Sequence, residues 1–219
     1  MVKKIIILVT LVFIGGILEP ARTSAVEIVP TDLGHKHFAG VRIGAWTSTG
    51  GSSALNDSLQ YSKSSIYAEF FYAHRFVPAL AGELSIGIFS RGDFHYLVQQ
   101  DVLLGTVNLY PIMLSAKIYP LAGLSGSKIY PYIQAGGCLF FGRRTATDYY
   151  YGYDFVDQSD TKITYVVGGG IDFQVADQIG LTSNVKYIPV KFGSPLAGIK
   201  DYSGWQVSFG VGYIFGKKH

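Results

Sequence analysis

The segment Trp205–Phe215, with the sequence WQVSFGVGYIF, sets the interpretation of the whole chain. Its apolar and aromatic residues occupy every second position, and Gln206, Ser208, Gly210 and Gly212 stand between them. A period of two predicts a β-strand with one apolar face and one face of small or polar residues. A strand of this length can also cross a bilayer when it is tilted.

Seven earlier segments repeat this alternation: Phe38–Trp46, Ser65–Phe76, Leu80–Ser90, Thr106–Tyr119, Tyr130–Gly142, Ile163–Gln174 and Ile179–Val190. The opposite faces are rich in glycine and small polar residues, which suit the narrow interior of an eight-stranded barrel. Aromatic residues recur near the ends of the apolar faces, as in the interfacial girdles of membrane barrels. They are Tyr72, Tyr110, Phe141, Tyr165, Phe173, Tyr187, Trp205 and Phe215.

The links between these segments alternate in length. The short links are Val77–Ala79, Leu121–Lys128 and Val175–Gln178, and the long links are Thr47–Ser64, Arg91–Gly105, Arg143–Lys162 and Lys191–Gly204. Bacterial outer-membrane barrels show the same alternation of short and long links, with the short turns on the periplasmic side. A bilayer offers no water to unpaired backbone groups, so a sheet that spans it has to close. The sequence therefore predicts an all-β fold, an eight-stranded antiparallel up-and-down transmembrane β-barrel.

Composition narrows the class of protein. Charged residues make up 15% of the 219 residues, against roughly 25% in an ordinary soluble domain. The single cysteine excludes a disulfide scaffold, and no heptad pattern indicates a coiled coil. A formal net charge of +3 is too small and too dispersed for a nucleic-acid-binding protein.

The chain is expected to begin with a secretory signal peptide over residues 1–25, because Lys3 and Lys4 precede the apolar run Ile5–Leu18. Cleavage is expected after Ala25, with Ala21 as a second site and an uncleaved signal anchor as the alternative. Residues 26–37 would then form a periplasmic N-terminal leader, residues 38–215 the barrel and residues 216–219 a basic C-terminal tail. The expected location is the bacterial outer membrane, with outer-membrane lipid, lipopolysaccharide and the barrel-assembly machinery as partners.

Several of these strands resemble those of OmpW-like outer-membrane proteins. The similar stretches are Leu109–Leu114 with Tyr119, Ile129–Gly136, Gly168–Phe173 with Tyr187, Trp205 with Gly212–Phe215, and Phe38–Gly44. The broader OmpA- and OmpX-type small barrels share the glycine-aromatic pattern. The resemblance implies an eight-stranded barrel whose narrow, largely apolar lumen carries small hydrophobic molecules and releases them sideways into the membrane. The chain departs from the family where Gly216–His219 follow the last aromatic residue.

The inward faces predict two layers in the lumen. A charged floor is expected from Arg42, Glu69, Glu83, Lys117, Asp172 and Lys186, which must pair because isolated charges are costly there. An apolar cup that lines a ligand site is expected above it, from Trp46, Tyr67, Val107, Cys138, Phe140 and Val166. This arrangement suggests a conduit or binding site for a small hydrophobic ligand, with an exit through the wall. The alternative is that these side chains merely pack the barrel.

Other functions find less support in the sequence. The Tyr-rich segment Tyr149–Phe155 would serve either as a lid or, in a sealed structural or adhesive barrel, as a binding surface. A lipid A-modifying enzyme is the remote alternative, because only His95 lies in an outer link and no hydrolase signature surrounds it. No catalytic residue is therefore assigned. His35-x-His37 supplies only two ligands, so no metal site or cofactor is expected from the sequence.

Overall fold

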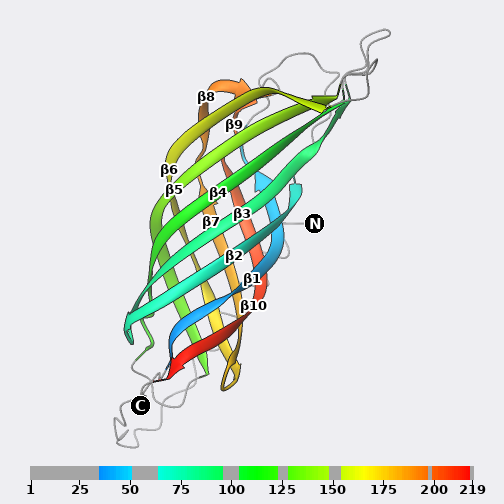
Figure 1. Ribbon diagram of the computed structural model, residues 1–219. Helices are drawn as coiled ribbons and strands as arrows, with labels where there is room; N and C mark the ends of the chain where they lie inside the picture. The colour runs from blue at the N-terminus through cyan, green and yellow to red at the C-terminus, as the bar shows by residue number, and fades with distance from the viewer. Residues whose placement is uncertain are drawn as a thin grey trace, which may run out of the picture.

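Eight strands form one closed antiparallel barrel in the computed structural model, which describes residues 35–50, 64–95, 104–122, 128–147, 154–196 and 199–217 (Figure 1). The barrel strands are β1 (His35–Ser48), β2 (Ser64–Val77), β3 (Leu80–His95), β4 (Leu104–Ile118), β5 (Ile129–Thr147), β6 (Asp154–Ala176), β7 (Ile179–Ile188) and β10 (Gly204–Lys217). Each pairs with its neighbour along the chain, except that β7 pairs with β10, and β10 closes the barrel on β1. The predicted fold class is confirmed, and every predicted strand lies over one of these eight.

The remaining strands, β8 (Lys191–Leu196) and β9 (Ile199–Asp201), form a separate two-stranded sheet. They lie inside the link that the sequence pattern left without structure. None of the described residues forms a helix that is long and apolar enough to cross a membrane.

The outer wall of the barrel is apolar. Ile43, Leu114 and Phe209 are each more than 60% exposed on three different strands. A soluble protein rarely exposes so continuous an apolar surface, whereas a transmembrane barrel needs one to face hydrocarbon. The outward alternation predicted from the sequence therefore describes the lipid-facing belt.

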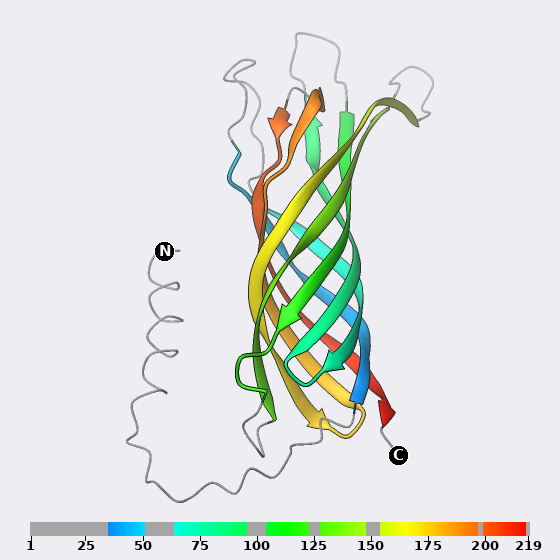
Figure 2. The ribbon, with the colours of Figure 1, turned by 90° about the vertical axis from the view of Figure 1, so that its left-hand side faces the viewer.

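The two ends of the barrel differ, as Figure 2 shows. At one end, β1 begins and β10 ends beside the tight turns Pro78–Ala79 and Asp177–Gln178. This end is called the short-turn end here, and the opposite end, which carries β8 and β9, is called the long-loop end. The predicted signal peptide lies outside the described residues.

Strands β5 and β6 extend further toward the long-loop end than expected. They pair as far as Thr147 and Asp154, which turns most of the predicted link Arg143–Lys162 into strand. The outward side chains of the extension include the exposed Ser159 and Thr161. The apolar alternation stops at the membrane surface because water solvates the wall above it, whereas the backbone ladder continues.

Candidate functional site in the barrel lumen

A network of buried charges crosses the lumen. Arg42 on β1 donates through Nη1 to Glu69 Oε1 at 2.7 Å and through Nη2 to Glu83 Oε2 at 2.6 Å. Lys117 Nζ lies 2.7 Å from the same Glu83 oxygen, and Lys186 Nζ lies 3.0 Å from Glu69 Oε1. Glu69 therefore joins cations from two other strands, and Glu83, which also lies 3.8 Å from Lys186, joins cations from three.

Asp172 completes the network at its edge toward the short-turn end. Its Oδ2 lies 3.5 Å from Lys117 Nζ and accepts a hydrogen bond from the Tyr119 hydroxyl at 2.8 Å. The structure thus brings together all the charged residues that the inward alternation selected. Their formal charges sum to zero.

Aromatic rings support the cations of this network, which the sequence pattern did not predict. The Arg42 guanidinium lies 3.7 Å from the ring centroid of Phe71, and Lys117 Nζ lies 4.0 Å from that of Tyr132. Such cation–π contacts are strongest where water is excluded. Both rings occupy inward positions next to a charge, so strand alternation alone could have indicated them.

An apolar layer lies above the charge network. Trp46 stacks on Phe89 with ring centroids 4.6 Å apart, and Phe140 lies 5.9 Å from Trp46 and 6.1 Å from Phe192. The predicted cup residues all belong to this cluster and are at most 2% exposed: Trp46, Tyr67, Val107, Cys138, Phe140 and Val166. They are packed against neighbouring side chains and do not line an open cup.

Tyr67 connects the two layers. Its ring belongs to the apolar cluster, and its hydroxyl donates to Glu69 Oε2 at 2.8 Å. A ligand that displaced this ring would therefore also disturb the hydrogen bonding of the charge network.

The β8–β9 hairpin and its flanks cover the apolar cluster, and together they are called the cap here. Phe192, Leu196, Ile199 and Tyr202 contribute buried side chains to the cluster. The Tyr202 hydroxyl donates to the carbonyl oxygen of Leu196 at 2.8 Å, which closes the hairpin on itself. A Cβ on Gly204 would stand 2.6 Å from the Trp46 ring, so the return of the chain into β10 depends on glycine there. The sequence pattern did not predict the cap, because these apolar residues do not recur at every second position as they do in the barrel strands.

A two-residue interruption of the β3–β4 pairing lies beside the apolar cluster, within a closed barrel whose register continues across it. The pairing of β3 with β4 includes Ile86 with Ile112 and Phe89 with Leu109, but it omits Gly87 and Ile88 between them. Pro111 stands in the facing part of β4 and has no N–H to donate to a ladder. Phe89 and Leu109, at the edge of this interruption, are both cluster residues.

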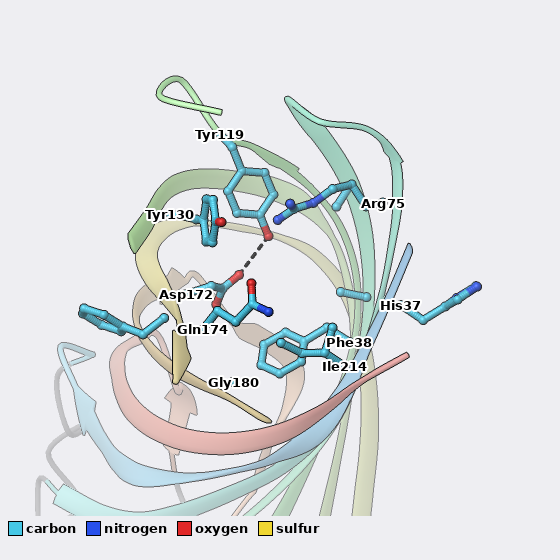
Figure 3. A pocket seen from close by; sticks show the side chains of 12 residues that line it. His37, Phe38, Arg75, Tyr119, Tyr130, Asp172, Gln174, Gly180 and Ile214 are labelled. Carbon is cyan, nitrogen blue, oxygen red and sulfur yellow. Dashed lines mark hydrogen bonds between the residues drawn. The ribbon is translucent and has the colours of Figure 1, made fainter. Parts of the chain in front are cut away.

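A small cavity lies below the charge network at the short-turn end (Figure 3). Arg75, Tyr119 and Asp172 face it, together with Phe38 and Tyr130, and the Arg75 guanidinium lies 4.4 Å from the Tyr119 ring centroid. Its volume of about 60 Å³ matches roughly two water molecules. Ligand pockets for drug-sized molecules are several-fold larger, so this cavity is too small to hold such a ligand.

Two comparisons with known proteins gave no match: no protein-family model and no curated protein matches the chain. Solved structures do. The outer-membrane protein OprG of Pseudomonas aeruginosa is 16% identical with a TM-score of 0.54, over 83% of this chain and 98% of OprG. Neisserial surface protein A is 17% identical with a TM-score of 0.52, over 82% of this chain and 96% of that one.

A third structure is Ail, the attachment invasion locus protein of Yersinia pestis, in complex with the heparin analogue sucrose octasulfate. It is 15% identical with a TM-score of 0.51, over 82% of this chain and 99% of Ail. At such identities the likeness concerns the fold alone. The chain therefore has the fold of the small eight-stranded outer-membrane barrels, as its resemblance to OmpW-like proteins implied.

Proposed function

We propose that this protein is a bacterial outer-membrane conduit or binding site for small hydrophobic molecules, which leave sideways into the membrane. The short-turn end then faces the periplasm, as in other barrels of this kind. Outer-membrane lipid and lipopolysaccharide surround the barrel, and the barrel-assembly machinery inserts it after the signal peptide has been removed.

The observation that carries this proposal is the interruption of the β3–β4 pairing beside an apolar cluster, which lies directly above a layer of paired charges. A hydrophobic solute that enters from the long-loop end can exchange apolar contacts with Trp46 and Phe140. It cannot continue along the barrel axis, because the next layer consists of paired charges. The segment beside Pro111 lacks part of its pairing with β3, so separating the two strands there breaks fewer backbone hydrogen bonds.

A disulfide across the interruption tests the exit. Ile88 and Tyr110 face each other there, so the Ile88→Cys, Tyr110→Cys pair can be cross-linked in a Cys138→Ser background. We expect oxidation to abolish uptake of the apolar dye N-phenylnaphthylamine by cells that depend on this protein, and reduction to restore it.

Leu84 and Leu114 provide the matched control, because they pair on the same seam and face the same side of the wall away from the interruption. The Leu84→Cys, Leu114→Cys disulfide should leave dye uptake unchanged. Equal uptake by the oxidised and reduced Ile88–Tyr110 variant would contradict exit at this place.

The competing function is a sealed structural or adhesive barrel that acts through its outer loops. It is favoured by the burial of the apolar cluster, whose residues are at most 4% exposed. Trp46 fluorescence in a Trp205→Phe variant discriminates between the two, since naphthalene that enters the cluster changes the emission of the buried indole. No response in correctly folded protein would support the sealed barrel.

The Tyr-rich segment Tyr149–Phe155 bears on the same choice. Its residues 149–153 lie outside the described part of the chain, and β6 begins at Asp154. If deletion of residues 149–155 abolishes adhesion to cells or matrix and leaves dye uptake intact, the adhesive function is supported. Altered dye uptake would support a role at the barrel mouth.

A further inference from the structure

Two histidines meet on the outer wall at the short-turn end. His37 on β1 pairs in register with His74 on β2, and their Nδ1 atoms are 3.3 Å apart. The Tyr72 hydroxyl lies 2.7 Å from the same His37 Nδ1. His37 is also one of the residues around the small cavity, and in Figure 3 its ring extends away from Tyr119 and Asp172.

His37 Nδ1 has more close polar neighbours than one hydrogen bond uses. The Nδ1 atom of a neutral imidazole carries either one proton or one lone pair, so it forms one good hydrogen bond at a time. His37 Nδ1 has two partners within hydrogen-bond distance, His74 Nδ1 and Tyr72 Oη. The two imidazole nitrogens can therefore both offer a lone pair to one cation, while the Tyr72 hydroxyl lies within hydrogen-bond distance beside them.

The spacing matches a metal ion with tetrahedral geometry. Zinc binds imidazole nitrogen at about 2.0–2.1 Å, which places two nitrogen ligands of a tetrahedron about 3.3–3.4 Å apart. The observed Nδ1–Nδ1 separation is 3.3 Å, and the ring planes are inclined by 37°. The two imidazoles thus stand at ligand spacing before any ion is added.

Neighbouring rings hold both imidazoles in place. Phe215 stacks on His37 with an interplanar angle of 14° and centroids 5.0 Å apart. Phe76 packs edge-on against His74 at 4.9 Å. Fixed ligands lose less conformational freedom when they bind, which favours affinity.

We propose that His37 and His74 bind a divalent transition-metal ion, best represented by Zn²⁺, on the outer rim of the short-turn end. Imidazole selects zinc, copper and nickel over magnesium and calcium. Among the side chains that the structure describes, no three histidine, cysteine or carboxylate groups gather as ligands, so water completes the coordination.

A bound ion would join β1 to β2 beside the seam where β1 pairs with β10. Because the metal binds the folded barrel and not the separated strands, it should raise the thermal unfolding temperature. The site therefore has two readouts, affinity and stability.

Calorimetric titration tests the proposal on the full mature chain, refolded in detergent without a polyhistidine tag and treated with chelator. We expect one equivalent of Zn²⁺ to bind and Mg²⁺ to produce no heat. His37→Ala and His74→Ala should each weaken Zn²⁺ binding at least about tenfold and remove the rise in unfolding temperature.

His95→Ala is the matched control, because His95 lies at the opposite end of the barrel, where β3 ends. It should bind Zn²⁺ like the unaltered protein. Unchanged affinity in His37→Ala or His74→Ala, or lost affinity in His95→Ala, would overturn the assignment. Should an alanine variant fail to refold, its glutamine counterpart carries the same test, with circular dichroism as the check of folding.

Discussion

Glu83 shows how single residues keep the lumen closed. Its carboxylate lies 2.6 Å from Arg42, 2.7 Å from Lys117 and 3.8 Å from Lys186, each on a different strand. Every one of these side chains is at most 1% exposed. Buried pairs contribute little beyond the cost of their own desolvation, but loss of one partner leaves the others uncompensated. Glu83 is therefore the residue whose neutralisation should matter most.

The Glu83→Gln variant removes the charge and keeps the shape of the side chain. We expect it to lower the free energy of unfolding by about 3–5 kcal/mol, as measured by urea titration of the refolded barrel in detergent. Lys191→Gln is the control, since Lys191 pairs with Asp201 at 3.5 Å while 76% exposed. Its effect should stay within about 1 kcal/mol. Similar losses in the two variants would contradict a special role for the buried network.

At the scale of elements, one carboxylate outside the membrane adds a polar contact between the cap and the barrel. Asp160 on β6 accepts a hydrogen bond from the Ser194 amide on β8 at 2.9 Å, and this bond lowers the pKa of Asp160. Asp160 lies beside Ser159 and Thr161, above the apolar belt. The cap is thus held to the barrel partly by a hydrogen bond that ionisation of Asp160 strengthens.

Acid should loosen the cap. Because the pKa of Asp160 is lowered by folding, its contribution is complete above the ordinary aspartate pKa of about 3.9 and is lost as the pH falls through the lowered value. Trp46 emission in a Trp205→Phe variant should shift over that acidic range as the cluster below the cap becomes hydrated. Asp160→Asn should remove most of this pH-dependent step, and an equal step in both proteins would assign it to another group.

The same scale shows what the sequence could and could not predict. The eight strands and the inward charges follow from alternation, because the two faces of a membrane barrel meet different surroundings. The cap escaped prediction because Phe192 and Tyr202 reach the cluster through tertiary contacts without a period. The meeting of His37 with His74 depends on strand register, which alternation restricts but does not determine.

At the scale of the whole molecule, the distribution of side chains is the reverse of that in a soluble protein. Ionised groups such as Arg42 and Lys117 are completely buried, whereas Leu114 and Ile163 are 67% and 78% exposed. The exposed apolar wall is not stable in water alone, because it would associate with other molecules. The barrel is stable only if hydrocarbon covers the apolar belt. The free-energy cost of a charge on that belt tests this requirement.

A charge placed on the belt makes that measurement. Leu114 lies in the middle of the outward face of β4, so Leu114→Arg should cost about 2–4 kcal/mol of unfolding free energy in lipid vesicles. Thr161→Arg places the same side chain on an outward position of β6 above the belt, where the cost should be about 0–1 kcal/mol. Urea unfolding in vesicles compares the two variants under one condition. Equal costs would mean that Leu114 and Thr161 face the same solvent, which a barrel that spans the membrane does not allow.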